Sequence, residues 1–161
     1  MKELVLIRHA KSTWEFNIED RDRPLTKKGM KRIKRMVLCS PKIFSSSEIM
    51  FSSTANRAIH TTSIIVNSLS LPLKVVNLVE DLYTFVASDL IHFLKNISDE
   101  YERVICVGHN PAITLAVSYF SSTDIDYLPT SAWAKLEFEQ SNWADITAGD
   151  LTLGIPKQIL E

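Results

Sequence analysis

The sequence lacks long apolar runs, a strong excess of charge and a recognisable leader, and each absence narrows the class of protein. Its apolar runs, such as Leu4-Val5-Leu6-Ile7, are a few residues long, whereas about 20 are needed to span a bilayer. The net charge of −1 offers no strongly basic surface of the kind that holds nucleic acid. The N-terminus enters a strand-like segment at once, without the charged and apolar regions of an export signal. We therefore expect a soluble, cytoplasmic protein whose partners are neither nucleic acids nor membranes.

Cysteine is scarce as well, and its two positions, Cys39 and Cys106, lie far apart in the chain. Cys106 sits inside an apolar run, so we expect both cysteines to be reduced packing residues. The four histidines form no pair or cluster with metal-ligand spacing. The sequence therefore predicts no metal site, and we expect no cofactor.

Apolar residues make up 45% of the 161 residues, enough for one sizeable core, and we expect a single domain over residues 1–161. Short apolar runs ended by polar residues predict buried strands of a parallel sheet. They lie at residues 3–8, 48–52, 73–79 and 103–108.

Helical spacing of apolar residues follows four capping residues, which are Thr26, Thr54, Ser88 and Asn110. Alternating strands and helices are typical of an α/β domain with helices on both faces of a largely parallel sheet. Residues 134–139 instead alternate apolar and charged side chains, which predicts an antiparallel strand added near an edge. Residues 15–23 read as a long loop after the first strand, a position that often carries function.

Reactive side chains stand at three of the predicted strand ends. Arg8 and His9 end the first strand, Arg57 follows the second, and His109 ends the strand at 103–108. Because ligands of open α/β sheets bind outside the carboxyl ends of the strands, we expect these four residues to meet at one edge.

Two guanidinium groups and two imidazoles in one place are suited to phosphate. Guanidinium forks match phosphate oxygens and stay charged, and their positive charge favours a neutral imidazole that can attack phosphorus. Arg57 would also lie in the first turn of a helix, where the macrodipole disfavours a cation unless an anion is bound. The pattern predicts phosphoryl transfer, which depends mainly on positioning and charge stabilisation.

Other features of the sequence argue against different phosphate chemistries. The four glycines are scattered and form no P-loop, and neither cysteine is followed six residues later by arginine, as in a cysteine-phosphatase loop. Asp124 and Asp126 resemble the paired aspartates of another phosphatase class, but no buried strand precedes them and we expect a loop there. His60 and His92 fall on predicted helices, and we interpret them as surface or half-buried residues.

Several segments, in order over nearly the whole chain, resemble the motifs of the histidine phosphatase superfamily and in particular its small SixA-type phosphohistidine phosphatases. The two main ones are Leu6–Ser12, which is similar to the phosphohistidine signature, and Val107–Pro111, which is similar to the second histidine motif. Further similar segments are Asp22–Thr26 with Gly29, Ser52-Ser53 with Arg57, Ala58 and Thr61, Leu82-Tyr83, and Leu128–Ala132.

The resemblance implies a phosphoglycerate mutase-like fold, a three-layer α/β/α sandwich around a mostly parallel sheet with an antiparallel edge strand. It implies that His9 is phosphorylated and then hydrolysed, that Arg8, Arg57 and His109 contact the phosphoryl oxygens, and that no metal is used. Lys11 and Ser12, inside the signature, are candidate substrate-binding residues. Larger members carry a carboxylate that donates a proton, and the nearest candidates here are Glu80, which we assign to this role, and Asp81.

The chain leaves little room for a capping insertion, so we expect an open site that admits phosphohistidine on a partner protein. Imidazole also leaves more easily than an alkoxide and tolerates a weak or absent acid. One alternative is a phosphatase for small phosphate esters or anhydrides, which would need a working acid such as Glu80. A second is a module that binds phosphate without turnover, although binding alone needs no nucleophile. The oligomeric state is left open.

Overall fold

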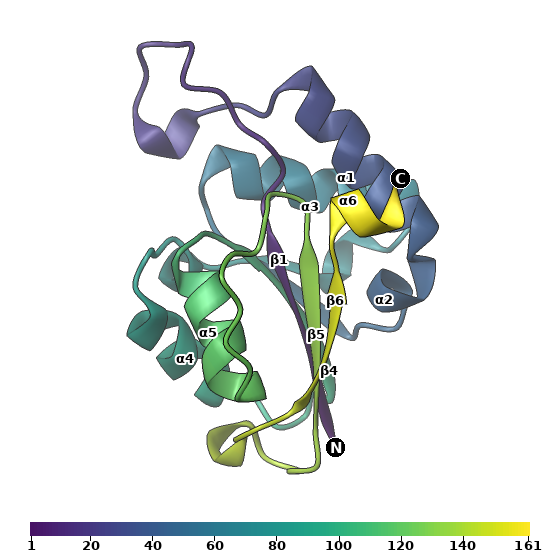
Figure 1. Ribbon diagram of the computed structural model, residues 1–161, viewed down its shortest axis with the longest axis vertical. Coiled ribbons are helices and arrows are strands. Elements are labelled where there is room, and N and C mark those ends of the chain that lie inside the picture. The colour runs from purple at the N-terminus through teal and green to yellow at the C-terminus, as the bar shows by residue number, and fades with distance from the viewer.

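The structure, a computed structural model, describes residues 1–161. The protein is built on one six-stranded sheet with the strand order β3-β2-β4-β1-β5-β6 (Figure 1). Strands β1 to β4 are parallel to one another, and β5 runs antiparallel to both of its neighbours, β1 and β6. The strands are β1 (Lys2–Arg8), β2 (Ile49–Ser52), β3 (Val76–Leu78), β4 (Arg103–Gly108), β5 (Trp133–Phe138) and β6 (Asp150–Gly154).

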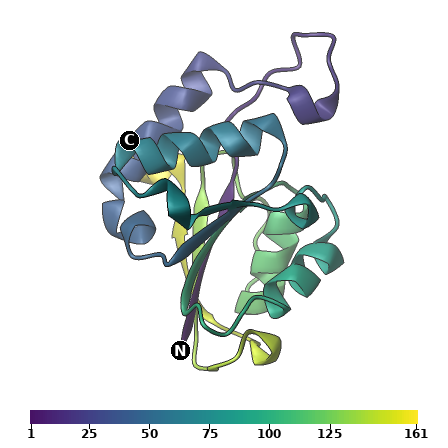
Figure 2. The same cartoon turned by 180° about the vertical axis from the view of Figure 1, so that it is seen from behind.

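Helices cover both faces of this sheet. Figures 1 and 2 show α4 and α5 on one face, and α1 and α3 with the short α2 and α6 on the other. The helices are α1 (Lys27–Cys39), α2 (Pro41–Ser45), α3 (Asn56–Ser68), α4 (Ala87–Lys95), α5 (Ala112–Ser121) and α6 (Pro156–Ile159). The predicted three-layer α/β/α sandwich around a mostly parallel sheet is confirmed.

The core is divided in two by the sheet. In β1, Leu4 and Leu6 pack into a cluster on the α4 and α5 side, whereas Val5 and Ile7 pack into the cluster that includes α1 and α3. All four side chains are at most 2% exposed. Successive residues of a strand point to opposite faces, so a strand covered on both sides is apolar throughout. This explains the continuous apolar run from which β1 was predicted.

The antiparallel strand predicted near an edge of the sheet is β5, although the edge position itself belongs to β6. Residues 134–139 do form most of β5, but β5 lies one position inside the edge because β6 pairs with its outer side. Strand β6 was not predicted: it is five residues long, its only large apolar residues are Leu151 and Leu153, and only Gly154 is buried.

The predicted helix starts are right for α1 and approximate elsewhere. The Thr26 hydroxyl accepts a hydrogen bond from Gly29 N at 2.9 Å, as expected of an N-cap. Thr54 lies one residue before the actual N-cap of α3, and Ser88 lies inside α4. Asn110 precedes the backbone cap of α5, yet its Oδ1 still accepts from Thr114 N at 3.1 Å. The predicted strand at 73–79 is a short 3₁₀ turn followed by β3.

The predicted loop at 15–23 contains one 3₁₀ turn, Asp20–Asp22, and projects from the end of the molecule at which β1 finishes (Figure 1). Residues 123–130, which include Asp124 and Asp126, also form no regular helix or strand, as predicted. No helix has the length and apolar character needed to cross a membrane.

Candidate active site

The carboxyl ends of β1, β4 and β2 lie side by side and bring the predicted residues together. Arg8 pairs with Gly108 in the parallel register of β1 and β4, and Ser52 pairs with Val107 in that of β2 and β4. The residues that follow these strand ends line a cleft of about 710 Å³. Its lining includes Arg8, His9, Arg57 and His109, the four residues expected to meet at one edge, and also Lys11 and Ser12.

The His9 imidazole is held with one nitrogen toward the backbone and the other toward Arg57. Nδ1 lies 2.7 Å from the carbonyl oxygen of Ala10, which can only accept a hydrogen bond, so Nδ1 carries the ring proton. Nε2 is then the unprotonated nitrogen, and its lone pair accepts a hydrogen bond from Arg57 Nε at 3.3 Å. The Ala10 peptide is fixed in turn, because its N–H donates to Thr61 Oγ1 at 2.9 Å.

The surroundings of His9 keep its ring neutral. Burial, followed by the positive charges of Arg57, Arg8 and Arg23, outweighs the hydrogen bond to Ala10 and lowers the pKa of His9 to about 3. The side chain is 7% exposed. At neutral pH, His9 therefore presents an unprotonated Nε2 at the edge of the cleft.

His109 lies beside His9, with their ring centroids 5.2 Å apart. Its Nε2 is 2.7 Å from Ser53 Oγ, and its Nδ1 is buried without a hydrogen-bond partner. Burial, with the neighbouring His9 and Arg57, lowers the pKa of His109 to about 3. The second imidazole is thus also neutral, with one nitrogen unengaged.

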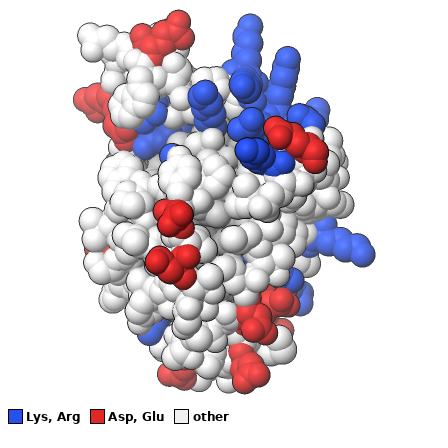
Figure 3. Space-filling view, viewed as in Figure 1, with Lys and Arg blue, Asp and Glu red and all other residues white.

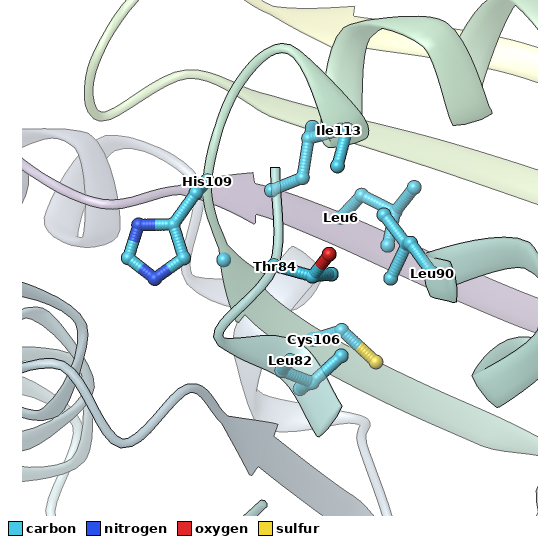
Figure 4. Close-up of a pocket in the computed structure, with 9 residues that line it drawn as sticks. Leu6, Leu82, Thr84, Leu90, Cys106, His109 and Ile113 are labelled. Atoms are coloured by element: carbon cyan, nitrogen blue, oxygen red, sulfur yellow. The ribbon is translucent and has the colours of Figure 1, made fainter. Parts of the chain in front are cut away.

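A small apolar cavity lies behind His109, on the side from which its ring points away (Figure 4). Figure 4 shows the imidazole pointing away from the side chains of Leu6, Leu90 and Ile113, which surround this cavity together with Leu82 and Cys106. Its volume of about 10 Å³ has room for about one water molecule. The cavity is therefore a packing void behind the site, and the larger cleft is where a ligand would bind.

Three guanidinium groups converge on the cleft, and two of them, those of Arg57 and Arg23, share the carboxylate of Asp20. Arg57 is 2% exposed, and it donates to Asp20 Oδ2 at 3.0 Å and to the Asp20 carbonyl at 2.7 Å. Arg23 donates to Asp20 Oδ1 at 3.0 Å and to Ser12 Oγ at 2.6 Å. Arg8 bonds to the Tyr127 hydroxyl and to the Leu128 carbonyl, and its buried Nε has no partner.

Asp20 is held as a carboxylate by these contacts. Burial raises its pKa, but hydrogen bonds from Tyr83, Arg23 and Arg57 outweigh that effect and bring the pKa down to about 2. The charged side chains that line the cleft are five cations, Arg8, Lys11, Arg23, Arg32 and Arg57, and the single anion Asp20. The cleft therefore has a strong excess of positive charge and suits an anionic ligand.

Glu80 does not lie in the lining of this cleft. Its carboxylate is paired with both terminal nitrogens of Arg21 and accepts from Thr54 Oγ1 at 2.5 Å. The Arg21 contact, and then that of Thr54, lowers the pKa of Glu80 to about 2, so it is ionised at neutral pH and has no proton to donate. Glu80 and Asp81 instead line a neighbouring hollow with Tyr83.

Several residues of the site were not predicted to have a part in it, among them Asp20, Arg23 and Ser53. Arg23 and Ser53 belong to segments that resemble family motifs, so a signal for them was present in the sequence. Asp20 had none, because the loop Glu19-Asp20-Arg21-Asp22-Arg23 alternates acidic and basic residues and only folding shows which carboxylate faces the arginines. Thr130 lines the cleft, whereas the Asp22 side chain does not.

His60 is half-buried and His92 exposed, as predicted, and neither lines the cleft. Cys106 is buried, and burial raises the pKa of its thiol. Cys39 is exposed, which corrects the expectation that it packs in the interior. No group of three or more His, Cys, Asp or Glu side chains is placed to hold a metal ion.

The model of the histidine phosphatase superfamily (branch 1) matches residues 4–83, about half of the chain. A SixA protein histidine phosphatase, solved with tungstate, has a similar fold with a TM-score of 0.81 at 20% identity, over 99% of each chain. The α-ribazole phosphatase of Shigella flexneri gives 0.69 at 14% identity, over 95% of each chain.

An uncharacterized protein of Mycobacterium tuberculosis is 27% identical over 153 residues, which cover 89% of this chain and 93% of that protein. The structural likenesses are below 25% identity and show a shared fold.

Proposed function

Because the chain belongs to the histidine phosphatase superfamily, we propose that it is a phosphatase in which His9 carries the phosphoryl group, and that its substrate is phosphohistidine on a partner protein. The observation that carries this proposal is the pair of hydrogen bonds that fixes His9. With its proton held on Nδ1 by Ala10 O, the ring keeps Nε2 unprotonated at the cleft, and a bound phosphoryl group would take over the Arg57 N–H that Nε2 accepts from here, which leaves the lone pair to attack phosphorus.

In the first step, Nε2 of His9 attacks phosphorus in line with the bond to the substrate imidazole. The new N–P bond forms as the old one breaks, and the substrate imidazole departs with a proton taken at its far nitrogen. Arg57 and Arg8 would hold the equatorial oxygens, where charge must be stabilised during transfer. Arg8 Nε and His109 Nδ1, both without a partner in the protein, would gain acceptors from the same group.

In the second step, water attacks phosphorus and releases inorganic phosphate. Phosphorylated on Nε2 and protonated on Nδ1, the His9 ring is cationic. It leaves as a neutral imidazole, because the proton stays on Nδ1 against the Ala10 carbonyl. The fixed tautomer would therefore serve both steps, as nucleophile in the first and leaving group in the second.

The substrate class is supported by the state of the two nearby carboxylates. Asp20 and Glu80 are both ionised through contacts with arginine, with pKa values of about 2. An alkoxide leaving from an ester needs a proton on the departing oxygen, whereas phosphohistidine can take its proton from water at the ring nitrogen remote from phosphorus. These carboxylates suit the second kind of leaving group.

The shape of the site supports a substrate carried on a protein. The rim bears Trp14 and Tyr127, which are 75% and 61% exposed, and small-molecule sites usually bury most of their ligand. A phosphorylated side chain needs only to reach the bottom of such a cleft.

The proposal is tested by trapping the phosphoenzyme and by comparing substrates. Wild-type protein given a radiolabelled phosphohistidine peptide should acquire an acid-labile, alkali-stable label. His9→Ala should abolish it, and His92→Ala, a change at an exposed histidine away from the cleft, should retain it. In parallel, kcat/KM for the peptide should exceed the values for sugar phosphates and nucleotides. A clear preference for the esters would reject the phosphohistidine substrate, and a label that survives in His9→Ala would reject the nucleophile.

A further inference from the structure

Helix α1 presents an unusually basic face beside the cleft. It contains six lysines and arginines and no acidic residue among 13 positions. Four of these, Lys28, Lys31, Arg32 and Arg35, surround one shallow hollow at the surface, and we call them the α1 basic face. Figure 3 shows Lys and Arg gathered over the part of the molecule that α1 occupies in Figure 1.

The charges of this face are not balanced within the protein. None of the four side chains is in a salt bridge, and the one hydrogen bond from them runs from Arg35 to the carbonyl of Leu160. The spacing Lys28, Lys31, Arg32, Arg35 puts like charges three and four residues apart, an arrangement that destabilises a helix. One acidic residue, Glu161, lies nearby, because it lines the adjoining hollow together with Arg32 and Arg35, but it forms no salt bridge with either. A bound anionic partner would relieve this repulsion.

The α1 basic face is continuous with the candidate active site through Arg32. The Arg32 side chain lines both the cleft that contains His9 and the hollow formed by the α1 basic face. Helix α1 begins two residues after Leu25, which pairs with Ser12 of the signature segment, so the helix is anchored next to the cleft. When the phosphorylated residue of a substrate protein enters the cleft, the residues that flank it would contact the α1 basic face.

We propose that the α1 basic face binds an acidic surface of the phosphorylated protein, beside the residue that enters the cleft; this inference rests on the proposed function. Charge complementarity selects an acidic partner. The cleft rim adds aromatic and arginine contacts typical of protein interfaces, since Arg23 stacks on exposed Trp14 and Arg8 lies over exposed Tyr127. A nucleic acid would instead call for charge spread over a larger surface, and the chain as a whole has a net charge of −1.

The test uses two phosphohistidine peptides that differ only in their flanking residues, Asp and Glu in one and Asn and Gln in the other. For the wild type at low salt, kcat/KM should be about tenfold higher for the acidic peptide, and the ratio should fall toward one as salt screens the charges. Lys28→Gln/Lys31→Gln/Arg35→Gln should bring the ratio to about one at low salt. Arg32 stays unchanged because it lines the cleft.

Two further variants and one further substrate serve as controls. Lys42→Gln/Lys74→Gln/Lys95→Gln removes the same charge from positions that line neither the cleft nor the α1 basic face, and should keep the ratio. Lys28→Arg/Lys31→Arg/Arg35→Lys keeps the charge and should also keep the wild-type ratio between the two peptides. This variant tests the role of charge even if the glutamine variant folds poorly. Hydrolysis of phosphoimidazole, which has no flanking residues, should be the same in all variants.

Different failures separate the two proposals. Equal hydrolysis of both peptides by the wild type, or an acidic preference that survives in the glutamine variant, would overturn the docking surface and leave the proposed function standing. Hydrolysis of neither peptide, with sugar phosphates turned over, would reject the proposed function. Binding of single-stranded RNA or of phosphatidylserine vesicles that the glutamine variant abolishes, without any preference between peptides, would assign the face to another partner and also overturn the inference.

Discussion

Acidification should destabilise the protein through the two histidines of the cleft. His9 and His109 are 7% and 2% exposed, and both have folded-state pKa values of about 3 against 6.5 for an ordinary histidine. Below pH 6.5 the unfolded chain binds a proton at each position and the folded protein does not. Stability therefore falls as pH decreases and stops falling through these groups only near pH 3.

The size of the effect follows from these pKa values. Between pH 7 and pH 5, each histidine should lower the free energy of unfolding by about 2 kcal/mol, which makes about 4 kcal/mol for the pair. The arginine-bound carboxylates Asp20 and Glu80 act in another range. Their stabilising contribution is complete above the pKa of an unfolded carboxyl and is lost only as pH falls toward about 2. The window from pH 7 to pH 5 thus isolates the imidazoles.

Urea unfolding at pH 7, 6 and 5 measures this effect. His9→Asn and His109→Asn each remove one titrating ring and should each reduce the loss by about 2 kcal/mol. His60→Asn and His92→Asn, at positions outside the cleft, are the matched controls and should leave the wild-type pH dependence unchanged. If the wild type and His9→Asn lose stability equally over this window, the ring is not held neutral by burial, and the reasoning about its free lone pair is refuted.

Three further predictions concern activity and packing. The rate of phosphoenzyme formation should stay level from pH 7 to pH 5 and fall only toward pH 3, as His9 becomes protonated; a midpoint near 6.5 in a rapid-quench pH profile would contradict this. Glu80→Gln should change kcat for a phosphohistidine peptide by less than about threefold, because Glu80 is ionised and bound to Arg21; a loss of about a hundredfold or more would restore it as the acid. Gly29→Ala should destabilise the protein by about 1–3 kcal/mol in urea unfolding, since its new Cβ would clash with the Lys11 carbonyl oxygen. If the variant is instead stabilised, as is usual for this change inside a helix, the Lys11 backbone moves aside and the prediction is wrong.

The sequence predicted the elements whose signal is local and strongly periodic. Strands β1 and β4 are buried on both faces, so their apolar runs are continuous and end where the polar site begins. That is why the positions of His9 and His109 at one sheet edge could be inferred. Strand β6 gave a weaker signal, because this edge strand has only two leucines in five residues and no continuous apolar run.

The parts of the site that were not predicted depend on contacts between distant segments. Asp20 becomes the shared partner of Arg23, Arg57 and Tyr83 only when the loop folds across the cleft. Glu80 stood near a motif in the sequence, but in the structure Arg21, 59 positions away along the chain, binds its carboxylate. Sequence position alone cannot distinguish a carboxylate held by arginine from one free to donate a proton, since the difference is made by tertiary contacts.

The central claim is most directly tested by the chemical position of phosphorus on the enzyme. Phosphoenzyme quenched within the first turnover, digested under alkaline conditions and mapped by mass spectrometry and phosphorus–nitrogen NMR should place the phosphoryl group on Nε2 of His9, because Nδ1 is engaged with the Ala10 carbonyl. Phosphorus on Nδ1, on His109 or on no residue of the enzyme would contradict the account.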